Sequence, residues 1–253
     1  KSTFLRYIAA TTKKKYIILA PTGIAAINAG GSTLHSFFKL PFYPLVPTDI
    51  RYTPRHIRQT LKYNKEKIKI IRELELLIID EISMVRADML DFIDKVLRIY
   101  SGNMREPFGG KQLLMVGDVY QLEPVVTSDA RQILEPFYPS AFFFYAHVFR
   151  QMPLVSIELR KVYRQSDPTF ISILDHIRVS QVSDTDLALL NKRVEQNGAQ
   201  TEQAPQNQDS PLSITLSARR DVVDYINRQE LDALEGGSEI FQGIIEGDFP
   251  QSS

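Results

Sequence analysis

The sequence predicts an α/β protein with a parallel sheet flanked by helices, and two observations carry that prediction. Apolar runs of strand length recur along the 253-residue chain, and several are nearly continuous in apolar residues, as in strands covered on both faces. Helical patterns lie between these runs, and strands that alternate with helices form parallel sheets. The length and the 43% hydrophobic content suffice for one large domain or two modest ones.

Hydrophobic periodicity and turn residues place the individual elements. The expected strands are Tyr16–Ala20, Leu76–Asp80, Leu113–Gly117, Leu154–Leu159 and Ile214–Ser217. The clearest expected helices are Thr3–Thr11, Thr22–Asn28, Pro54–Arg72, Arg86–Tyr100 and Pro168–Arg178. The expected loops are Leu40–Thr53, rich in proline and aromatics, and Gly198–Ser210, rich in Gln. A second α/β pattern starts near Glu158–Arg164, which predicts a domain boundary there.

The composition excludes several classes of site and partner. The chain has no cysteine, which excludes disulfide scaffolds, thiolate metal sites and cysteine nucleophiles. No apolar run approaches the length of a membrane span, so no membrane partner is expected. The 30 basic and 30 acidic residues cancel, which speaks against a histone-like basic binder.

The charges are divided unevenly along the chain. Residues 1–72 contain 14 Lys/Arg and two acidic residues, a net charge of +12, so residues 73–253 carry −12. Eight of the Lys/Arg lie between Arg51 and Arg72. Such asymmetry favours a nucleic-acid-binding surface on the basic part. The alternative is a solvated basic face with compensating acids nearby in the fold.

The first candidate for nucleotide chemistry stands at residue 1. Lys1, Ser2 and Thr3 open a helical segment, as do the last residues of a phosphate-binding loop of the form GxxxxGK[ST]. The glycines of such a loop would lie before residue 1. A Lys-Ser pair alone is no evidence, so this interpretation depends on the motifs that follow.

Two adjacent carboxylates, Asp80 and Glu81, follow the second expected strand. Parallel sheets bind ligands at the carboxyl ends of their strands. In phosphoryl transfer an Asp at this place holds Mg²⁺, and a neighbouring Glu can orient and deprotonate the attacking water. The alternative is that Asp80 or Ser83 only caps the next helix.

Two later polar residues are candidates for contacts to a phosphate. Gln121 follows the strand that ends at Gly117, where a neutral amide can contact a γ-phosphate without adding charge. Arg164 opens the second expected domain, from where an arginine finger can reach the transition state across a cleft. The alternatives are an exposed turn for Gln121 and a surface ion pair of Arg164 with Asp167 or Asp175.

Small and hydroxyl-bearing residues follow the first expected strand, from Ala20 to Ser36. Backbone amides and Thr or Ser hydroxyls suit contacts to phosphodiesters. His35, Phe37 and Phe38 have rings that can stack on bases. Helical spacing nevertheless places at least one of the two Phe rings in the core.

These segments, in this order, resemble the motifs of superfamily 1 helicases. The resemblance is strongest to the petite-integration-frequency (PIF) family of the 5′→3′ branch (superfamily 1B), which is related to RecD. Motifs Ia, Ib, II, III and IV resemble segments 20–26 (APTGIAA), 33–38 (TLHSFF), 79–84 (IDEISM), 117–122 (GDVYQL) and 163–165 (YRQ). Ser83–Leu97 resembles the signature helix of the family, whose Met89, Phe92, Ile93 and Val96 are then expected in the core. The resemblance covers residues 1–180.

The resemblance implies a RecA-like P-loop NTPase core that uses ATP and Mg²⁺. Residues 1–160 would form the first RecA-like domain, with residues 40–72 as a basic excursion, and residues 161–253 part of a second one. The implied nucleotide contacts are Lys1, Ser2 and Thr3, and the implied Mg²⁺ ligands are Ser2 and Asp80. The implied catalytic base, γ-phosphate sensor and arginine finger are Glu81, Gln121 and Arg164. The implied DNA contacts are Pro21, Thr22, Gly23, Thr33, His35, Ser36 and Phe37.

The function implied is that of an ATP-dependent 5′→3′ DNA helicase or translocase in replication, repair, recombination or genome maintenance. Single-stranded DNA and single-strand/duplex junctions are the expected partners, G-quadruplexes a further candidate, and a monomer the expected state. A bacterial source implies the cytoplasm and a eukaryotic one the nucleus or mitochondrion. Motifs V and VI are not recognisable, so a longer parent chain is expected. The alternatives are a non-catalytic nucleic-acid-binding module and another P-loop NTPase, such as a nucleotide kinase.

Overall fold

The computed structural model describes residues 1–163, 165–192, 216–234, 236–237 and 239. The chain forms two units, Lys1–Lys192 and Arg193–Ser253, each considered by itself. The domain boundary expected at residue 160 lies inside the first unit and stays a prediction. In the second unit the described part contains α10 (Arg220–Asp232). None of the helices in the described ranges has the length and apolar character to cross a membrane.

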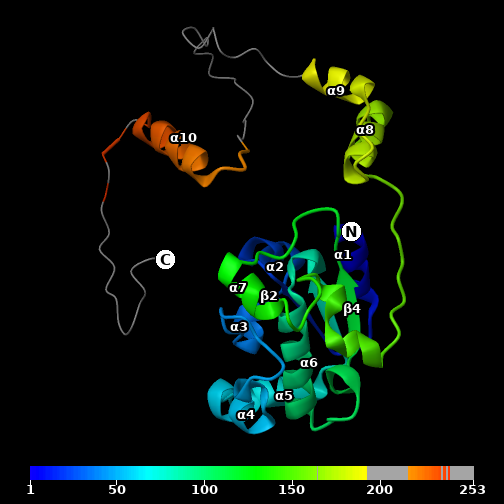
Figure 1. Ribbon diagram of the computed structural model, residues 1–253, viewed down its shortest axis with the longest axis vertical. Coiled ribbons are helices and arrows are strands. Elements are labelled where there is room, and N and C mark those ends of the chain that lie inside the picture. The colour runs from blue at the N-terminus through cyan, green and yellow to red at the C-terminus, as the bar shows by residue number, and fades with distance from the viewer. Residues whose placement is uncertain (164, 193–215, 235, 238, 240–253) are drawn as a thin grey trace. The chain divides into compact units, whose positions relative to one another are not determined.

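A parallel four-stranded sheet forms the centre of the first unit (Figure 1). Its strands are β1 (Tyr16–Ala20), β2 (Ser32–Thr33), β3 (Leu76–Asp80) and β4 (Gln112–Val116), in the order β2-β1-β3-β4. The predicted parallel α/β architecture is therefore confirmed, with β1 and β3 at their expected bounds and β4 one residue early. Because all neighbours are parallel, the carboxyl ends of the strands meet at one edge of the sheet.

Helices and short 3-10 turns connect and cover these strands. They are α1 (Ser2–Thr11), α2 (Gly23–Ala29), α3 (Leu34–Phe38), η1 (Ile50–Tyr52), α4 (Pro54–Leu61), α5 (Lys65–Glu73), η2 (Ile82–Met84), α6 (Ala87–Ser101), η3 (Pro107–Gly110), α7 (Ser128–Leu134), η4 (Phe143–Tyr145), η5 (His147–Gln151), α8 (Pro168–Arg178) and α9 (Asp184–Asn191). Four of the five expected helices are confirmed within one residue at each end. The helices α3, α7 and α9 were not predicted.

Alternate residues of the central strands supply two separate cores. Ile18 and Ile78 pack with Leu5 of α1 on one face of the sheet. Leu19 and Ile79 belong to the larger core on the other face, which α3, α5 and α6 complete. Both faces of the sheet are thus covered, which explains the continuous apolar runs of β1 and β3.

The helix expected over Pro54–Arg72 is in fact two helices, so this prediction was wrong in its extent. The chain turns at Lys62, whose φ of 40° is left-handed, and α4 ends there. Asn64 begins α5 because its side chain accepts a hydrogen bond from the Lys67 amide at 2.8 Å. The intervening Tyr63 is buried, and its hydroxyl donates to the Phe38 carbonyl at 2.6 Å.

The strand expected over Leu154–Leu159 is absent, so this prediction was wrong. Val155 is 90% exposed and Ile157 78% exposed, and no strand of the described residues pairs with them. An apolar run becomes a strand only where a neighbouring strand satisfies its backbone groups. The expected strand Ile214–Ser217 lies partly, and the expected loop Gly198–Ser210 wholly, outside the described residues.

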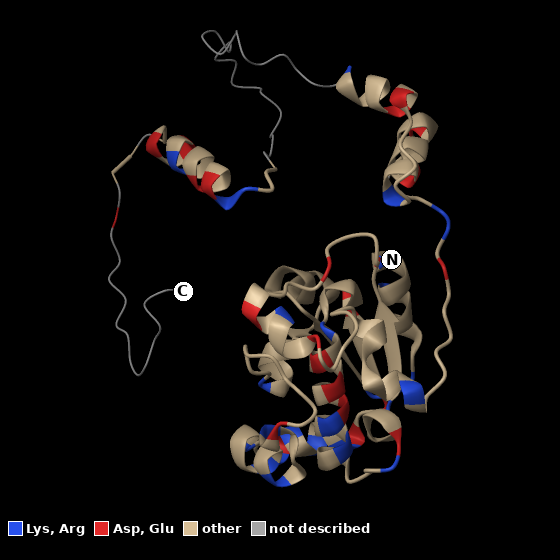
Figure 2. Cartoon of the chain, in the orientation of Figure 1, with Lys and Arg blue, Asp and Glu red and all other residues tan. Residues whose placement is uncertain are grey.

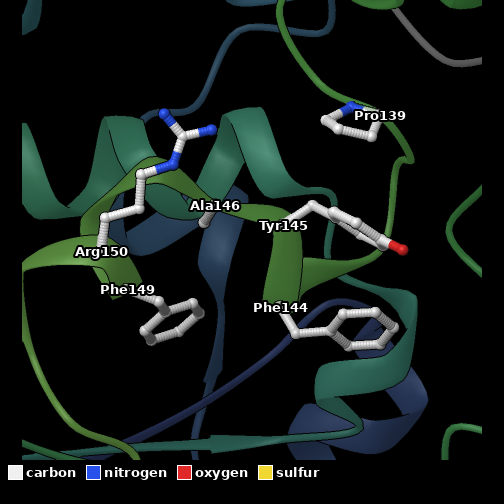
Figure 3. Close-up of a pocket in the computed structure, with 6 residues that line it drawn as sticks. All are labelled: Pro139, Phe144, Tyr145, Ala146, Phe149 and Arg150. Atoms are coloured by element: carbon white, nitrogen blue, oxygen red, sulfur yellow. The ribbon is translucent and has the colours of Figure 1, made fainter.

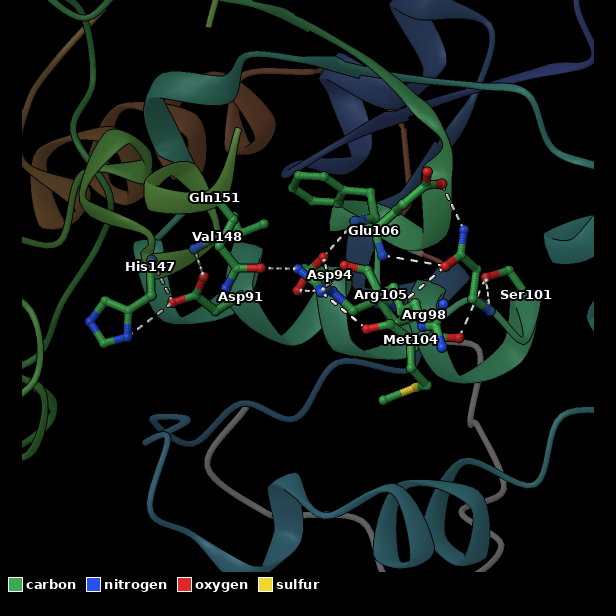
Figure 4. A network of polar contacts seen from close by, with 12 residues as sticks. Asp91, Asp94, Arg98, Ser101, Met104, Arg105, Glu106, His147, Val148 and Gln151 are labelled. Carbon is green, nitrogen blue, oxygen red and sulfur yellow. Dashed lines mark hydrogen bonds and ion pairs between the residues drawn. The ribbon is translucent and has the colours of Figure 1, made fainter. Parts of the chain in front are cut away.

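Helix α6 supplies many of the buried side chains of the larger core in the first unit. The expected burial of Met89, Phe92, Ile93 and Val96 is confirmed. Its acidic side chains fix the turns that follow, as Figure 4 shows. Asp91 accepts hydrogen bonds from the amides of His147 and Val148 at 2.9 Å. Asp94 in the same way accepts from the amide of Phe108 and the guanidinium of Arg98.

An aromatic pocket of about 210 Å³ opens where the chain folds over α6 (Figure 3). Its lining includes Phe144, Tyr145, Phe149 and Arg150. None of the candidate residues for nucleotide or DNA contacts lies in it, so the functional site is to be sought at the sheet edge instead.

Candidate functional site

The structure brings Lys1, Asp80 and Glu81 together at the carboxyl edge of the sheet. Lys1 Nζ donates a hydrogen bond to Glu81 Oε1 and lies 3.8 Å from Asp80 Oδ1. These side chains are 79 and 80 positions apart in the sequence, yet they form one cluster of a cation and two carboxylates. Such a cluster has the groups needed for a phosphate, a divalent cation and a water molecule.

The turn after β3 holds the two carboxylates in different environments. Asp80 is buried, and its Oδ1 accepts the amide of Glu81 at 2.9 Å. Glu81 has a left-handed backbone with φ 51°, an uncommon conformation for a residue other than glycine and one that is frequent at functional sites. This turn directs Glu81 toward Lys1, while Asp80 remains in line with the strand.

Gly117 allows the turn after β4 to approach the turn after β3. A Cβ at this position would lie 2.8 Å from Cγ2 of Ile82 and 3.2 Å from the amide of Ser83. Any side chain would therefore separate the two turns. The glycine places the segment that carries Gln121 beside the segment that carries Asp80.

Gln121 is held by a neighbouring carboxylate that the sequence interpretation did not include. Gln121 Nε2 donates to Asp118 Oδ2 at 3.0 Å, and the Tyr120 amide donates to Asp118 Oδ1 at 3.2 Å. Arg178 of α8 forms an ion pair with the same carboxylate, and its guanidinium lies 5.6 Å from the Tyr120 ring centroid. Asp118 and Arg178 thus link the turn of Gln121 to α8.

The surroundings of Asp118 keep its side chain ionised. Burial alone would raise the pKa of Asp118, but the hydrogen bonds from Tyr120, Arg178 and Gln121 outweigh it and lower the pKa. The spacing from Asp118 to Gln121, as in a short turn, was a signal that the sequence offered. The contact with Arg178 depends on tertiary structure.

The remaining expected nucleotide residues have simpler surroundings. Ser2 and Thr3 are exposed in the first turn of α1, where the Ser2 hydroxyl has no partner within the described ranges. Across those ranges no three His, Asp or Glu side chains form a metal-binding group. A Mg²⁺ ion at Asp80 and Ser2 would then complete its shell with phosphate and water oxygens, as Mg²⁺ usually does. Arg164 lies outside the described residues.

The expected DNA contacts lie at the amino ends of two helices on the same edge of the sheet. Thr22 caps α2 by accepting from the Ala25 amide at 3.3 Å, and Thr33 caps α3 by accepting from the Ser36 amide at 3.1 Å. Both hydroxyl hydrogens remain available as donors, beside amides that helix starts leave unpaired. Ala20 ends β1 next to the strand that ends at Asp80, so the two sites begin on adjacent strands.

Aromatic stacking in this area involves a residue that the sequence interpretation missed. The ring of His35 stacks on Phe42 with a centroid distance of 5.3 Å and an interplanar angle of 13°. Phe42 is 89% exposed, so its outer face is open to a base. Burial and, to a lesser extent, the charge of Arg86 lower the pKa of His35, which is therefore neutral at pH 7.

The start of α6 fixes the loop that carries Phe42. Asp88 is buried, accepts the Leu45 amide at 2.9 Å and forms a two-bonded ion pair with Arg86. The Tyr52 hydroxyl donates to the Asp88 carbonyl at 2.9 Å. The expected loop Leu40–Thr53 thus contains one short turn, η1, and is fixed to the helix at Leu45 and at Tyr52.

The prediction that Phe37 contacts DNA has to be corrected. It is 9% exposed, packs edge-on against Phe38, and carries the Lys67 ammonium 3.1 Å from its ring centroid. Its ring is therefore part of the core and not available for stacking. The helical spacing of α3 turns this side chain inward, as the sequence already indicated for at least one of the two rings.

Comparison with known proteins identifies relatives over almost the whole chain. The family model of PIF1-like helicases matches residues 1–188. The ATP-dependent DNA helicase PIF1 of Candida albicans is 31% identical over 99% of this chain and 27% of its own length. The ATP-dependent DNA helicase RRM3 of Saccharomyces cerevisiae is 30% identical over 96% of this chain and 31% of its own length.

Solved structures that are similar to this chain are helicases of the same kind. The Pif1 helicase from Bacteroides in complex with ADP-AlF3 and single-stranded DNA is 40% identical, with a TM-score of 0.85, over 100% of this chain and 55% of that chain. The Candida albicans Pif1 helicase is 28% identical, with a TM-score of 0.70, over 93% of this chain and 48% of that chain. The chain spans about a third of the curated relatives and about half of the solved ones. This chain belongs to the PIF1-like helicase family.

Proposed function

We propose that the complete protein containing this chain is an ATP-driven DNA helicase that moves 5′→3′ along one strand. One observation carries the proposal: the cluster of Lys1, Asp80 and Glu81 and the helix starts at Thr22 and Thr33 share one edge of the sheet. Because β1 and β3 are neighbours, hydrolysis at one strand end lies about one strand spacing, roughly 4.8 Å, from the backbone that leads into the DNA contacts.

The residues around Lys1 would each have a different role in ATP hydrolysis. Lys1, Ser2 and Thr3 would bind the phosphates at the start of α1, and Asp80 with Ser2 would hold Mg²⁺. The ion supplies positive charge that neutralises charge developing on the phosphates. Glu81 would orient the attacking water and accept its proton. The contact of Lys1 with Glu81 supports this division, because ATP phosphates would compete for the same ammonium group.

The DNA contacts are proposed to be independent of base sequence. The hydroxyls of Thr22, Thr33 and Ser36 and the amides of α2 and α3 would bind phosphates, which position a strand without reading it. The exposed ring of Phe42, backed by His35, would stack on a base. Such contacts suit a motor that releases and regrips the strand at every step.

Strand unwinding tests the proposed activity. The complete protein with ATP and Mg²⁺ is expected to separate a duplex with a 5′ single-stranded tail and to leave one with a 3′ tail intact. A fluorescence-quench assay on the two tailed duplexes and a blunt one measures this. Separation of the 3′-tailed duplex alone would contradict the proposed direction, and separation of none would contradict the helicase.

The ion pair between Arg178 and Asp118 is expected to keep Gln121 in place during hydrolysis. Arg178→Ala and Asp118→Asn should each lower kcat about tenfold, since about 1.4 kcal/mol of transition-state stabilisation is lost. The KM for ATP should change little. A double-mutant cycle on kcat should give a coupling of at least about 0.5 kcal/mol. Additive effects of the two substitutions would show that Arg178 and Asp118 do not act as a pair in hydrolysis.

A further inference from the structure

A basic pocket lies between α4, α5 and the last turn of α6. It has a volume of about 290 Å³, and Arg58, Lys62 and Arg72 line it together with Tyr63 and Tyr100. In Figure 2 the ribbon positions of Lys and Arg gather on α4 and α5, at the end of the first unit away from the start of α1. None of the residues proposed to contact ATP or the single strand lines this pocket.

The cations of the pocket have no carboxylate partner within the described residues. Of the two acidic side chains on α5, Glu73 pairs with Lys15 and Lys69, and Glu66 forms no ion pair in the described part of the chain. Lys111 brings a further positive charge, because its Nζ donates to the carbonyl of Arg72 at 2.8 Å. The cations that line the pocket, Arg58, Lys62 and Arg72, therefore form no ion pair with a described carboxylate, although Glu75 lies close enough to Lys111 to act on its pKa.

A neighbouring lysine on α5, Lys67, lies close enough to a second cation to feel its charge. Burial and, next, the charge of Lys39 lower the pKa of Lys67 to about 8. Lys39 itself donates to the carbonyl of Leu61 and lies 5.8 Å from the ring centroid of Tyr63, behind the pocket wall. Like charges are thus crowded around α4 and α5, and an anionic ligand would relieve this repulsion.

The aromatic walls of the pocket are closed to stacking. Tyr63 and Tyr100 are each 8% exposed, and their ring centroids lie 4.7 Å apart. Single strands are usually held by bases that stack on aromatic side chains, and such stacking needs an open ring face. The exposed guanidinium of Arg58 can instead bind phosphate oxygens through two parallel hydrogen bonds, and Arg72, whose Nε donates to the Tyr100 carbonyl at 3.4 Å, has its two terminal nitrogens left for the same purpose.

The position of the pocket separates it from the proposed strand contacts. Arg72 precedes the amino end of β3, whereas Asp80 stands at its carboxyl end, about 13 Å of strand away. Tyr100 lies at the end of α6, whose start braces the loop next to His35. A polynucleotide in the pocket would therefore be a different segment from the one at Thr22 and Thr33.

We infer that this pocket binds the phosphate backbone of the duplex arm of a single-strand/duplex junction, as a second DNA contact. In a duplex the bases are hidden and phosphates recur at regular spacing, which matches a site with cations and no open ring. The inference rests on the proposed function, because it assumes that the other sheet edge holds the single strand. It adds a surface that would keep the protein at the junction.

Salt-dependent binding to two DNAs tests the inference. The complete protein and its Arg58→Ala/Arg72→Ala variant are titrated with blunt duplex and with an oligothymidine of equal length. For the duplex, the negative slope of log K against log[salt] should become shallower by about 1.8, since each lost phosphate contact removes about 0.9 from its magnitude. Affinity for the duplex at 50 mM salt should fall about tenfold. Binding to the oligothymidine should stay unchanged.

A matched control removes two exposed cations outside the pocket, Arg6→Ala/Lys13→Ala, on and just after α1. This control should leave the duplex slope unchanged. An unchanged slope in the pocket variant, or an equal loss on both DNAs, would overturn the inference. The ATPase rate with oligothymidine separates the two proposals. If oligothymidine stimulates the wild-type ATPase but the pocket variant binds duplex like wild type, only the inference about the pocket is refuted. If oligothymidine does not stimulate the wild-type ATPase, the proposed motor function is refuted.

Discussion

Replacing Glu81 with glutamine is expected to lower ATP turnover of the complete protein by about 10²- to 10⁴-fold, the usual contribution of a general base. Glutamine has nearly the same shape but cannot accept the proton of the attacking water. Because Glu81 pairs with Lys1, its neutral replacement also frees the ammonium for phosphates. ATP should therefore bind as tightly as before or more tightly, and single-stranded DNA should bind equally well.

Steady-state phosphate release and fluorescence titrations with ATP and oligothymidine measure these three quantities. Glu135→Gln is the matched control, because Glu135 is exposed after α7 and forms no ion pair in the described part of the chain. That control should keep the wild-type rate. Turnover within about threefold of wild type in Glu81→Gln, less than 1 kcal/mol by transition-state theory, would remove Glu81 from its role.

Replacing Lys1 with alanine is expected to abolish hydrolysis in a different way. The lost ammonium is the only described cation in contact with Asp80 and Glu81, so the variant leaves two carboxylates facing the incoming phosphates. ATP affinity should fall together with turnover, unlike in Glu81→Gln. Arginine should not restore function, since its planar fork is larger than a compact ammonium.

The measurement for Lys1→Ala is the dissociation constant of ATP by titration, together with turnover. Lys13→Ala serves as the control, because Lys13 is an exposed lysine just after α1. Binding of single-stranded DNA in the absence of ATP should be equal in wild type and both variants. An unchanged affinity for ATP in Lys1→Ala would show that the phosphates bind elsewhere.

Much of the fold follows from local sequence pattern. The runs at Tyr16–Ala20 and Leu76–Asp80 are continuous and apolar because helices cover both faces of the sheet, and the helices α1, α6 and α8 begin and end near their expected residues. Patterns fail where the deciding interaction is distant in sequence. Leu154–Leu159 has a strand composition but no described neighbour to pair with. The break at Lys62 depends on Tyr63 reaching Phe38.

The candidate site also contains both residues that the sequence predicts and residues that only the structure reveals. The carboxylates Asp80 and Glu81 could be predicted because they end a buried strand, and their contact with Lys1 agrees with the role expected of it. The pairing of Arg178 with Asp118 could not be predicted, because sixty residues separate the two in the sequence and no motif links them. Phe42 stood in a segment without periodicity, so only its contact with His35 reveals it.

DNA held at the starts of α2 and α3 is expected to control hydrolysis at Lys1, Asp80 and Glu81. The most direct test is the rate of ATP hydrolysis by the complete protein with and without single-stranded DNA. A rate that rises with oligothymidine concentration, and no longer does so in Glu81→Gln, is the expected result. Equal rates with and without DNA would contradict the motor and favour a nucleotide-hydrolysing enzyme of another kind.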